Sequence, residues 1–193
     1  MGSRRLGRQR LYSLEKRGKE SANRPGPGIA DAVVYSKVSR DGAQITTEIV
    51  VDLGTSKAAI KSKNTDGDVI GVDGGGAAYL TEITTAVNGI VTDAEIICTE
   101  TPTTGEPDLN LVYATSATLA YDSAGGSDIL VDSNADLVIG FNKVGSGVND
   151  NDVNANHPYI YLAVGTNSSP AAGTYDAGKI IIRIYGYAVE DDI

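Results

Sequence analysis

The alternation of apolar and polar residues over short segments is the feature that most constrains the fold of this chain. In residues 44–53, every second side chain is apolar or β-branched, namely Ile45, Thr47, Ile49, Val51 and Leu53. Successive side chains of a β-strand point to opposite faces, so this spacing predicts a strand with one face in a core.

Further strand-like segments follow at close spacing, each bounded by turn residues. They are residues 57–61, 69–72, 79–83, 89–99, 109–113, 118–121, 128–131, 137–141, 158–164 and 179–189. Many short strands separated by glycine, asparagine and aspartate are typical of sandwiches and barrels rather than of βαβ units. We therefore expect an all-β fold, a jelly-roll-like β-sandwich over residues 29–193, with an immunoglobulin-like sandwich as the alternative.

The N-terminal segment differs from the rest of the chain in charge. Residues 1–26 hold eight basic and two acidic residues, a net charge of 8 − 2 = +6. The other residues hold 8 basic and 23 acidic residues, a net charge of 8 − 23 = −15. A helical pattern over residues 3–19 is weakened by two glycines, and the Pro-Gly repeat at 25–28 ends it. The sequence therefore predicts an extended basic arm and linker over residues 1–28, which becomes ordered on contact with a partner.

The composition of this arm favours a protein as its partner. Arginine outnumbers lysine six to two, and arginine suits hydrogen-bonded protein contacts as well as phosphates. An acidic body would repel a nucleic-acid duplex lying across it, so nucleic acid is not the expected main partner. The residues expected to bind the partner are Arg4, Arg5, Leu6, Arg8, Arg10, Leu11, Tyr12, Lys16, Arg17 and Arg24.

The histidine and cysteine content gives little support to a catalytic or zinc centre. A Ser-His-Asp or Cys-His centre would depend on His157, which precedes a proline at the junction of a loop and a strand. Cys98 ends the run Glu95-Ile96-Ile97-Cys98, which is typical of a buried strand thiol. With one cysteine, no intramolecular disulfide forms and a Cys/His zinc site is not expected.

One glycine-rich segment and two acidic segments resemble phosphate-binding and calcium-binding loops only in part. The glycines at 74–76 lack the Gly-x4-Gly-Lys-Ser/Thr spacing of a phosphate loop, so we expect a turn there. Residues 149–154 alternate oxygen-bearing side chains, but the sixth and twelfth positions counted from Asp150 do not fit an EF-hand. The turn region of Asp66, Asp68 and Asp73 is similar. We expect no enzymatic activity, no cofactor and no metal, and leave calcium binding at these loops open.

Three stretches, about a fifth of the chain, carry a pattern typical of one class of proteins. They are the opening MGSRRLGRQRLY, the strand segment ITTEIVVDLG at 45–54, and GTYDAGK at 173–179 with the isoleucine-rich strand and Tyr185-Gly186-Tyr187 after it. These stretches resemble small virion structural proteins of marine tailed bacteriophages. The resemblance implies a capsid decoration or cement protein, which is β-rich, often trimeric and bound to the shell of the major capsid protein.

This resemblance implies a protein made in the host cytoplasm and located in the virion, with the major capsid protein and neighbouring copies of itself as partners. An arm of 26 residues reaches ~85 Å when fully extended, enough to span a joint between subunits. The alternatives are a tail, neck or fibre component of the virion, and a carbohydrate- or nucleic-acid-binding module. No apolar run approaches 18 residues and no signal peptide is recognised, so contact with a membrane is not expected.

Overall fold

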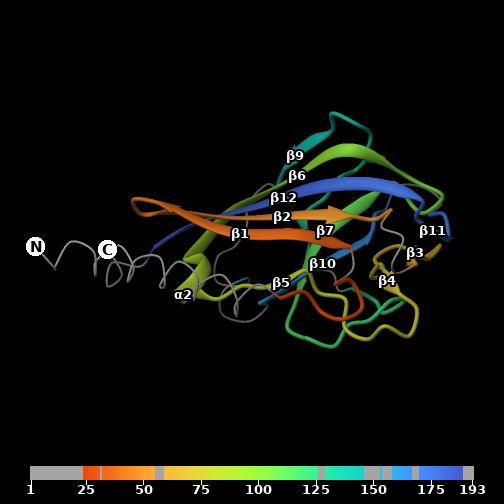
Figure 1. Ribbon diagram of the computed structural model, residues 1–193, viewed down its shortest axis with the longest axis horizontal. Helices are drawn as coiled ribbons and strands as arrows, with labels where there is room; N and C mark the ends of the chain where they lie inside the picture. The colour runs from red at the N-terminus through yellow and green to blue at the C-terminus, as the bar shows by residue number, and fades with distance from the viewer. Residues whose placement is uncertain are drawn as a thin grey trace, which may run out of the picture.

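The strands of the chain form antiparallel sheets, as the computed structural model shows (Figure 1). The structure describes residues 24–30, 32–54, 59–125, 129–145, 153, 158–166 and 170–188. Besides strands, these residues include a short helix, α2 (Thr85–Asn88). The expected all-β class is therefore confirmed.

The largest sheet has five strands and places the C-terminal strand in its middle. In order across the sheet they are β1 (Val33–Asp41), β2 (Gln44–Asp52), β12 (Ala177–Tyr187), β6 (Ile90–Thr103) and β9 (Asn142–Val144). A two-residue turn, Gly42-Ala43, joins β1 to β2. Gly42 has a φ of 59°, which a type II′ hairpin turn requires at its first central position.

Two smaller sheets complete the body. One has the strands β5 (Thr81–Glu82), β10 (Tyr159–Val164), β7 (Leu109–Ala114) and β8 (Ile129–Val131), in that order. The other has the strands β11 (Gly173–Thr174), β3 (Ile60–Ser62) and β4 (Gly71–Val72). Buried side chains from all three sheets belong to one hydrophobic core, so the sheets form packed layers around it.

The core is built on alternate residues of the central strand β12. Ile180, Ile182 and Ile184 are at most 1% exposed, whereas the residues between them lie partly exposed on the outer face. Strand β2 shows the same alternation, which confirms the pattern predicted for residues 44–53. Strand β10 is buried from Ile160 to Val164, as expected for the continuous apolar run in its sequence.

Two of the expected strands are wrong. Residues 118–121 form a turn with one isolated bridge, between Ala120 and Ala77. Residues 137–141 lie before β9 and form a turn instead of a strand. A hydrogen bond from the Phe141 amide to the Val138 carbonyl closes this turn, in which Gly140 has a φ of 88°. Part of the segment 57–61 lies outside the described residues, and β3 begins at Ile60.

Strand β1 was not expected from the sequence. Its central residues are polar or charged because the strand lies at the edge of the sheet, and most of its described side chains are exposed. An edge strand needs no continuous apolar pattern, since only part of its surface meets the core.

The chain is attached to the body directly after the basic segment. The Gly26 amide donates to the Tyr79 carbonyl at 2.7 Å, and the Gly28 amide donates to the Ala77 carbonyl at 2.7 Å. A Cβ atom at Gly26 would lie 2.3 Å from the Ala77 oxygen, so this approach requires glycine. The Pro-Gly repeat, expected to be a linker, therefore lies on the body at these glycines.

The two faces of β12 give the first testable prediction. Replacing the fully buried Ile182 by alanine should lower the free energy of unfolding by about 2–5 kcal/mol, because a cavity is left in the core. The matched control is Ile181→Ala on the outer face, where we expect a loss of about 1 kcal/mol or less. Urea denaturation measures both values, and equal losses would contradict the assigned faces.

Burial of a tyrosine gives a prediction about alkaline pH. Tyr161 is fully buried and donates its hydroxyl to the Ser116 carbonyl, and burial raises its pKa to about 12. The unfolded phenol ionises near pH 10, so stability from the neutral Tyr161 is complete below pH 10 and is lost as the pH rises from 10 to 12. Tyr161→Phe should flatten this fall in the free energy of unfolding. An unaltered pH profile in the Tyr161 variant would refute the prediction.

Candidate interaction surface

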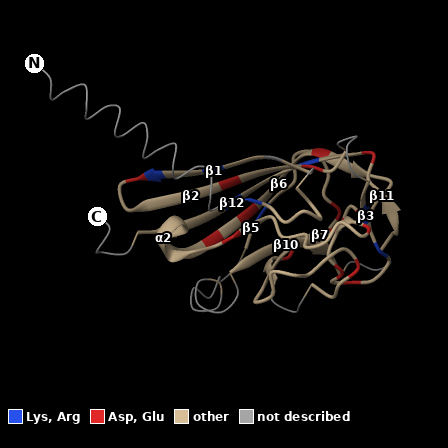
Figure 2. Ribbon diagram, turned by 60° about the horizontal axis from the view of Figure 1, so that its bottom comes forward, with Lys and Arg blue, Asp and Glu red and all other residues tan. Residues whose placement is uncertain are grey.

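A row of alternating charges crosses the outer face of the five-stranded sheet. Lys37 lies opposite Glu48, Glu48 lies opposite Arg183, and Arg183 lies opposite Glu95. Directly opposite residues of neighbouring antiparallel strands share one face and lie close enough to interact. Figure 2 shows acidic and basic positions next to one another on this sheet. We call these four residues the charge row.

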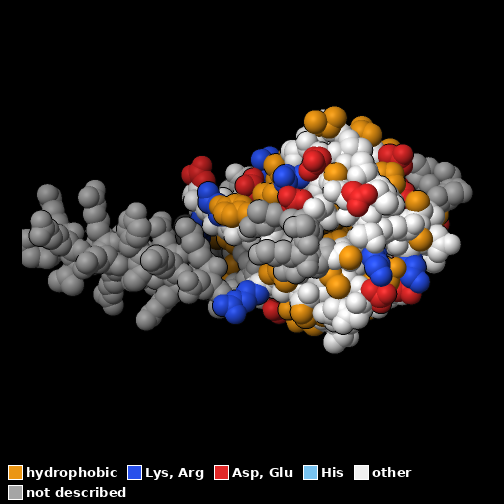
Figure 3. All heavy atoms as spheres, turned by 45° about the vertical axis from the view of Figure 1, so that its right-hand side comes forward, with side chains coloured by type: hydrophobic (Ala, Val, Ile, Leu, Met, Phe, Trp, Pro, Cys, Tyr) orange, Lys and Arg blue, Asp and Glu red, His pale blue; other side chains and the backbone are white. Residues whose placement is uncertain are grey.

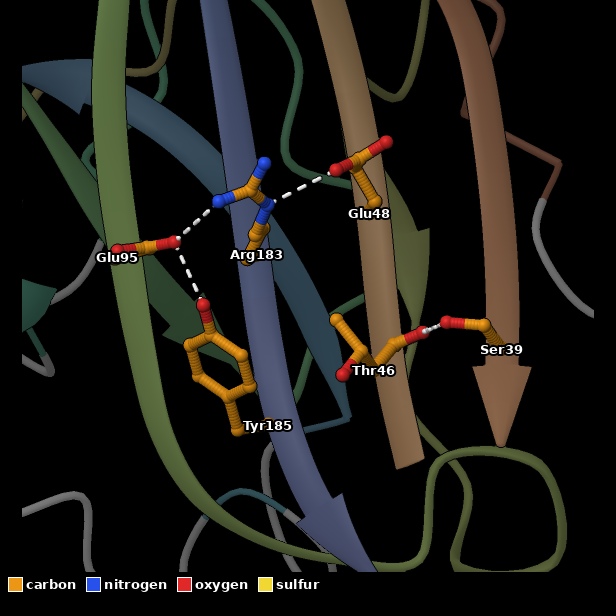
Figure 4. Close-up of polar contacts among 6 residues, drawn as sticks. All are labelled: Ser39, Thr46, Glu48, Glu95, Arg183 and Tyr185. Atoms are coloured by element: carbon orange, nitrogen blue, oxygen red, sulfur yellow. Dashed lines mark hydrogen bonds and ion pairs between the residues drawn. The ribbon is translucent and has the colours of Figure 1, made fainter. Parts of the chain in front are cut away.

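Arg183 forms the centre of the charge row (Figure 4). Its Nε atom lies 2.9 Å from Glu48 Oε2 and its Nη1 atom lies 3.0 Å from Glu95 Oε1. The Tyr185 hydroxyl donates a further hydrogen bond, of 2.6 Å, to the same Glu95 oxygen. The side chain of Glu95 is 10% exposed, against 33% for Glu48, so Arg183 and Tyr185 partner a nearly buried carboxylate.

These contacts raise the pKa values of Arg183 and Tyr185. Hydrogen bonds to Glu48 and then to Glu95 raise the pKa of Arg183 above its already high value. Burial, followed by the hydrogen bond to Glu95, raises the pKa of Tyr185. Arg183 therefore stays charged and Tyr185 stays neutral around neutral pH.

An apolar row runs beside the charge row on the same face. Tyr35 lies opposite Val50, Val50 opposite Ile181, and Ile181 opposite Ile97. Tyr35 is 45% exposed, and the other three side chains are half-buried. A space-filling view shows exposed hydrophobic side chains among charged ones (Figure 3). Such a mixed surface suits contact with another protein, where apolar contacts and paired charges act together.

A second polar group is buried between the sheets and has a structural role. The two Glu106 carboxylate oxygens accept hydrogen bonds from the amides of Asp108 and Ala171. The Ser133 hydroxyl donates to Asp108, and the Ser133 amide donates to Asn110 at 2.9 Å. These contacts join the loops after β6, β8 and β10. Sequence analysis did not single these residues out, because acidic residues in turns are usually solvated.

Of the residues that the sequence offered as candidates for a catalytic or binding site, Cys98 lies in the core and the described glycines of residues 74–76 lie in a turn. Cys98 is 1% exposed, as expected for a strand thiol, and burial raises its pKa. Gly74 and Gly76 have φ values of 73° and 85°, as turn glycines do. His157 lies outside the described residues, as do residues 149–152 and 154.

Ion pairs lie in and beside the acidic turn region of Asp66, Asp68 and Asp73. Lys61 pairs with Asp73 at 3.2 Å, and Lys63 pairs with Asp122 at 2.9 Å. Burial raises the pKa of Asp68. Among the described residues, no group of three or more histidine, cysteine and acidic side chains is placed to hold a metal ion.

Nearly all residues predicted to bind a partner through the arm lie outside the described residues. Arg24 is the exception, and its side chain is exposed two residues before the attachment at Gly26. No helix within the described ranges is long and apolar enough to cross a membrane.

Three comparisons with known proteins were made. Protein-family models, curated proteins and solved structures each give no match to this chain. A function is therefore inferred from the chain's own surfaces and charges.

The charge row gives a prediction about stability. Arg183→Met should lower the free energy of unfolding by about 1–3 kcal/mol, because it removes the cationic partner of the nearly buried Glu95. Lys179→Met is the matched control, since Lys179 forms a single 3.2 Å pair with the more exposed Asp52. We expect a change below about 1 kcal/mol there. Equal losses in urea denaturation would argue against a special role for Arg183.

Proposed function

We propose that this chain is a non-enzymatic virion structural protein, a capsid decoration or cement protein that stabilises the head of a tailed bacteriophage. Its basic arm binds the shell of the major capsid protein, and its body contacts neighbouring copies, with a trimer as the favoured assembly. This function needs rigid surfaces and multiple attachments rather than a catalytic centre.

The observation that carries this proposal is the attachment of the chain at Gly26 and Gly28. A segment with a net charge of +6 is followed at once by backbone hydrogen bonds to a body with a net charge of −15. When the arm is bound to the capsid shell, these hydrogen bonds would carry load from the arm to the body, as a cementing protein requires. The sequence stretches that resemble small virion proteins support the same function.

The outer face of the five-stranded sheet supports contact with a protein surface. It combines the charge row with the half-buried apolar row that begins at Tyr35. The proposed body is a β-sandwich of jelly-roll type. Its support is a chain that passes from one large sheet to the other after β5, β6, β8 and β9, and returns to the five-stranded sheet in β12.

Cosedimentation with purified heads that lack this protein tests the proposal. The full chain should sediment with the heads, whereas a variant that begins at Arg24 should not, because it lacks the arm but keeps Gly26 and Gly28 on the body. A full-length variant with Arg4, Arg5, Arg8 and Arg10 replaced by glutamine separates the effect of charge from that of length, and we expect it to bind at least about tenfold more weakly.

The other outcomes contradict parts of the proposal. Equal binding by the full chain and by the variant beginning at Arg24 would mean that the body, not the arm, attaches to the shell. Absence of binding by both would exclude the head as the site. Labelling of whole particles would then show whether the protein lies on the tail, neck or fibres.

A further inference from the structure

Strand β1 has an outer edge that no described strand pairs with. It is the last strand of the five-stranded sheet, and its nine residues pair with β2 alone among the described elements (Figures 1 and 2). Tyr35, Lys37 and residues 39–41 are exposed. A long edge of this kind presents a row of backbone donors and acceptors to another chain.

The hairpin turn fixes which backbone groups face outward. Asp41 and Gln44 flank the two-residue turn, so they form a hydrogen-bonded pair. Hydrogen-bonded and non-bonded pairs alternate along an antiparallel ladder. The backbone groups of Lys37 and Ser39 therefore bond to β2, and those of Ser36, Val38 and Arg40 point to the open edge.

A second copy of this chain matches the edge in one register. We propose that β1 pairs antiparallel with β1 of a second copy about a two-fold axis at Val38, so that the two five-stranded sheets join. This contact joins two copies and is therefore distinct from the three-fold contact of the trimer proposed above. Ser36 then lies opposite Arg40 of the other copy, and Tyr35 lies opposite Asp41. All outward-facing backbone groups from residues 36 to 40 are paired, and side chains on one face stay on that face.

Charge disfavours two of the neighbouring registers, and the length of the pairing disfavours a third. An axis at Lys37 would place two lysines directly opposite each other, and an axis at Arg40 would do the same for two arginines, which is unfavourable. With the axis at Val38, Lys37 lies opposite Ser39 of the other copy. Its two diagonal neighbours there are Asp41 and the second Lys37, so each long lysine side chain can turn toward Asp41 and away from the like charge. An axis at Ser39 would place Lys37 directly opposite Asp41 of the other copy, but it would pair only residues 37–41, whereas the axis at Val38 pairs residues 35–41.

A buried hydroxyl on β1 supports the same pairing independently. Within the described part of the chain, Ser36 Oγ is the buried side-chain oxygen without a hydrogen-bond partner. Such a group usually has a partner in the functional state of a protein. The proposed register places the guanidinium of Arg40, whose Nε donates to the Gly42 carbonyl of its own chain at 3.1 Å, directly across from this hydroxyl.

Sedimentation velocity of the full chain with Val38→Pro tests the pairing. Proline removes the outward amide of Val38 and leaves the hydrogen bonds to β2 intact, so we expect the fold to persist in circular dichroism and self-association to fall at least about tenfold. Val38→Ala keeps this amide and should associate as the natural chain does. A natural chain that is monomeric at high concentration, or an oligomer that Val38→Pro leaves unchanged, would overturn the proposal.

A charge exchange tests it without a proline. Lys37→Asp and Asp41→Lys should each weaken association by about tenfold, since each places like charges near one another at two symmetric positions. The double variant should restore association, and Lys143→Asp on the opposite edge strand β9 should have no effect. Failure of the double variant to restore association would contradict the pairing. These measurements use no heads, so they are independent of the proposed function.

Discussion

The pairing of β12 with β2 on one side and β6 on the other is the constraint on which the rest of the structure depends. It brings together three segments that are far apart in sequence and fixes their register. Alternate isoleucines of β12 then fill the core, while Arg183 and Tyr185 necessarily face outward. The apolar core and the ordered charge row are therefore two faces of one strand pairing.

In this arrangement, the residues that stabilise the fold lie on the core side of the sheets, and the surfaces proposed to bind partners lie outside it. The core side is occupied mainly by aliphatic side chains from all three sheets, and among the described residues no group of three or more histidine, cysteine and acidic side chains is placed to hold a metal ion. The outer face, the open edge of β1 and the attachment after the basic segment carry the features suited to partners. Because Gly26 and Gly28 bind the body through backbone hydrogen bonds, the contacts that we propose for the arm and for the sheet would be mechanically joined.

Sequence alone predicted the parts of the fold in which local pattern and burial agree. Strand β2 and the isoleucine-rich β12 were predictable because their side chains alternate or run apolar through the core. Strand β1 was missed because an edge strand tolerates Lys37 and Arg40 where a central strand would not. The charge row was missed because the meeting of Glu48, Glu95 and Arg183 depends on register between distant strands.

Native-state amide hydrogen exchange tests the central position of β12 most directly. Amides of β12 at positions 180–184, which bond to strands on both sides, should exchange only through global unfolding and be the slowest in the chain. Amides of the short edge strand β9 should exchange faster through local opening. If β12 exchanged as fast as β9, β12 would not be the strand that joins the sheet, and the assigned core and outer faces would both be wrong.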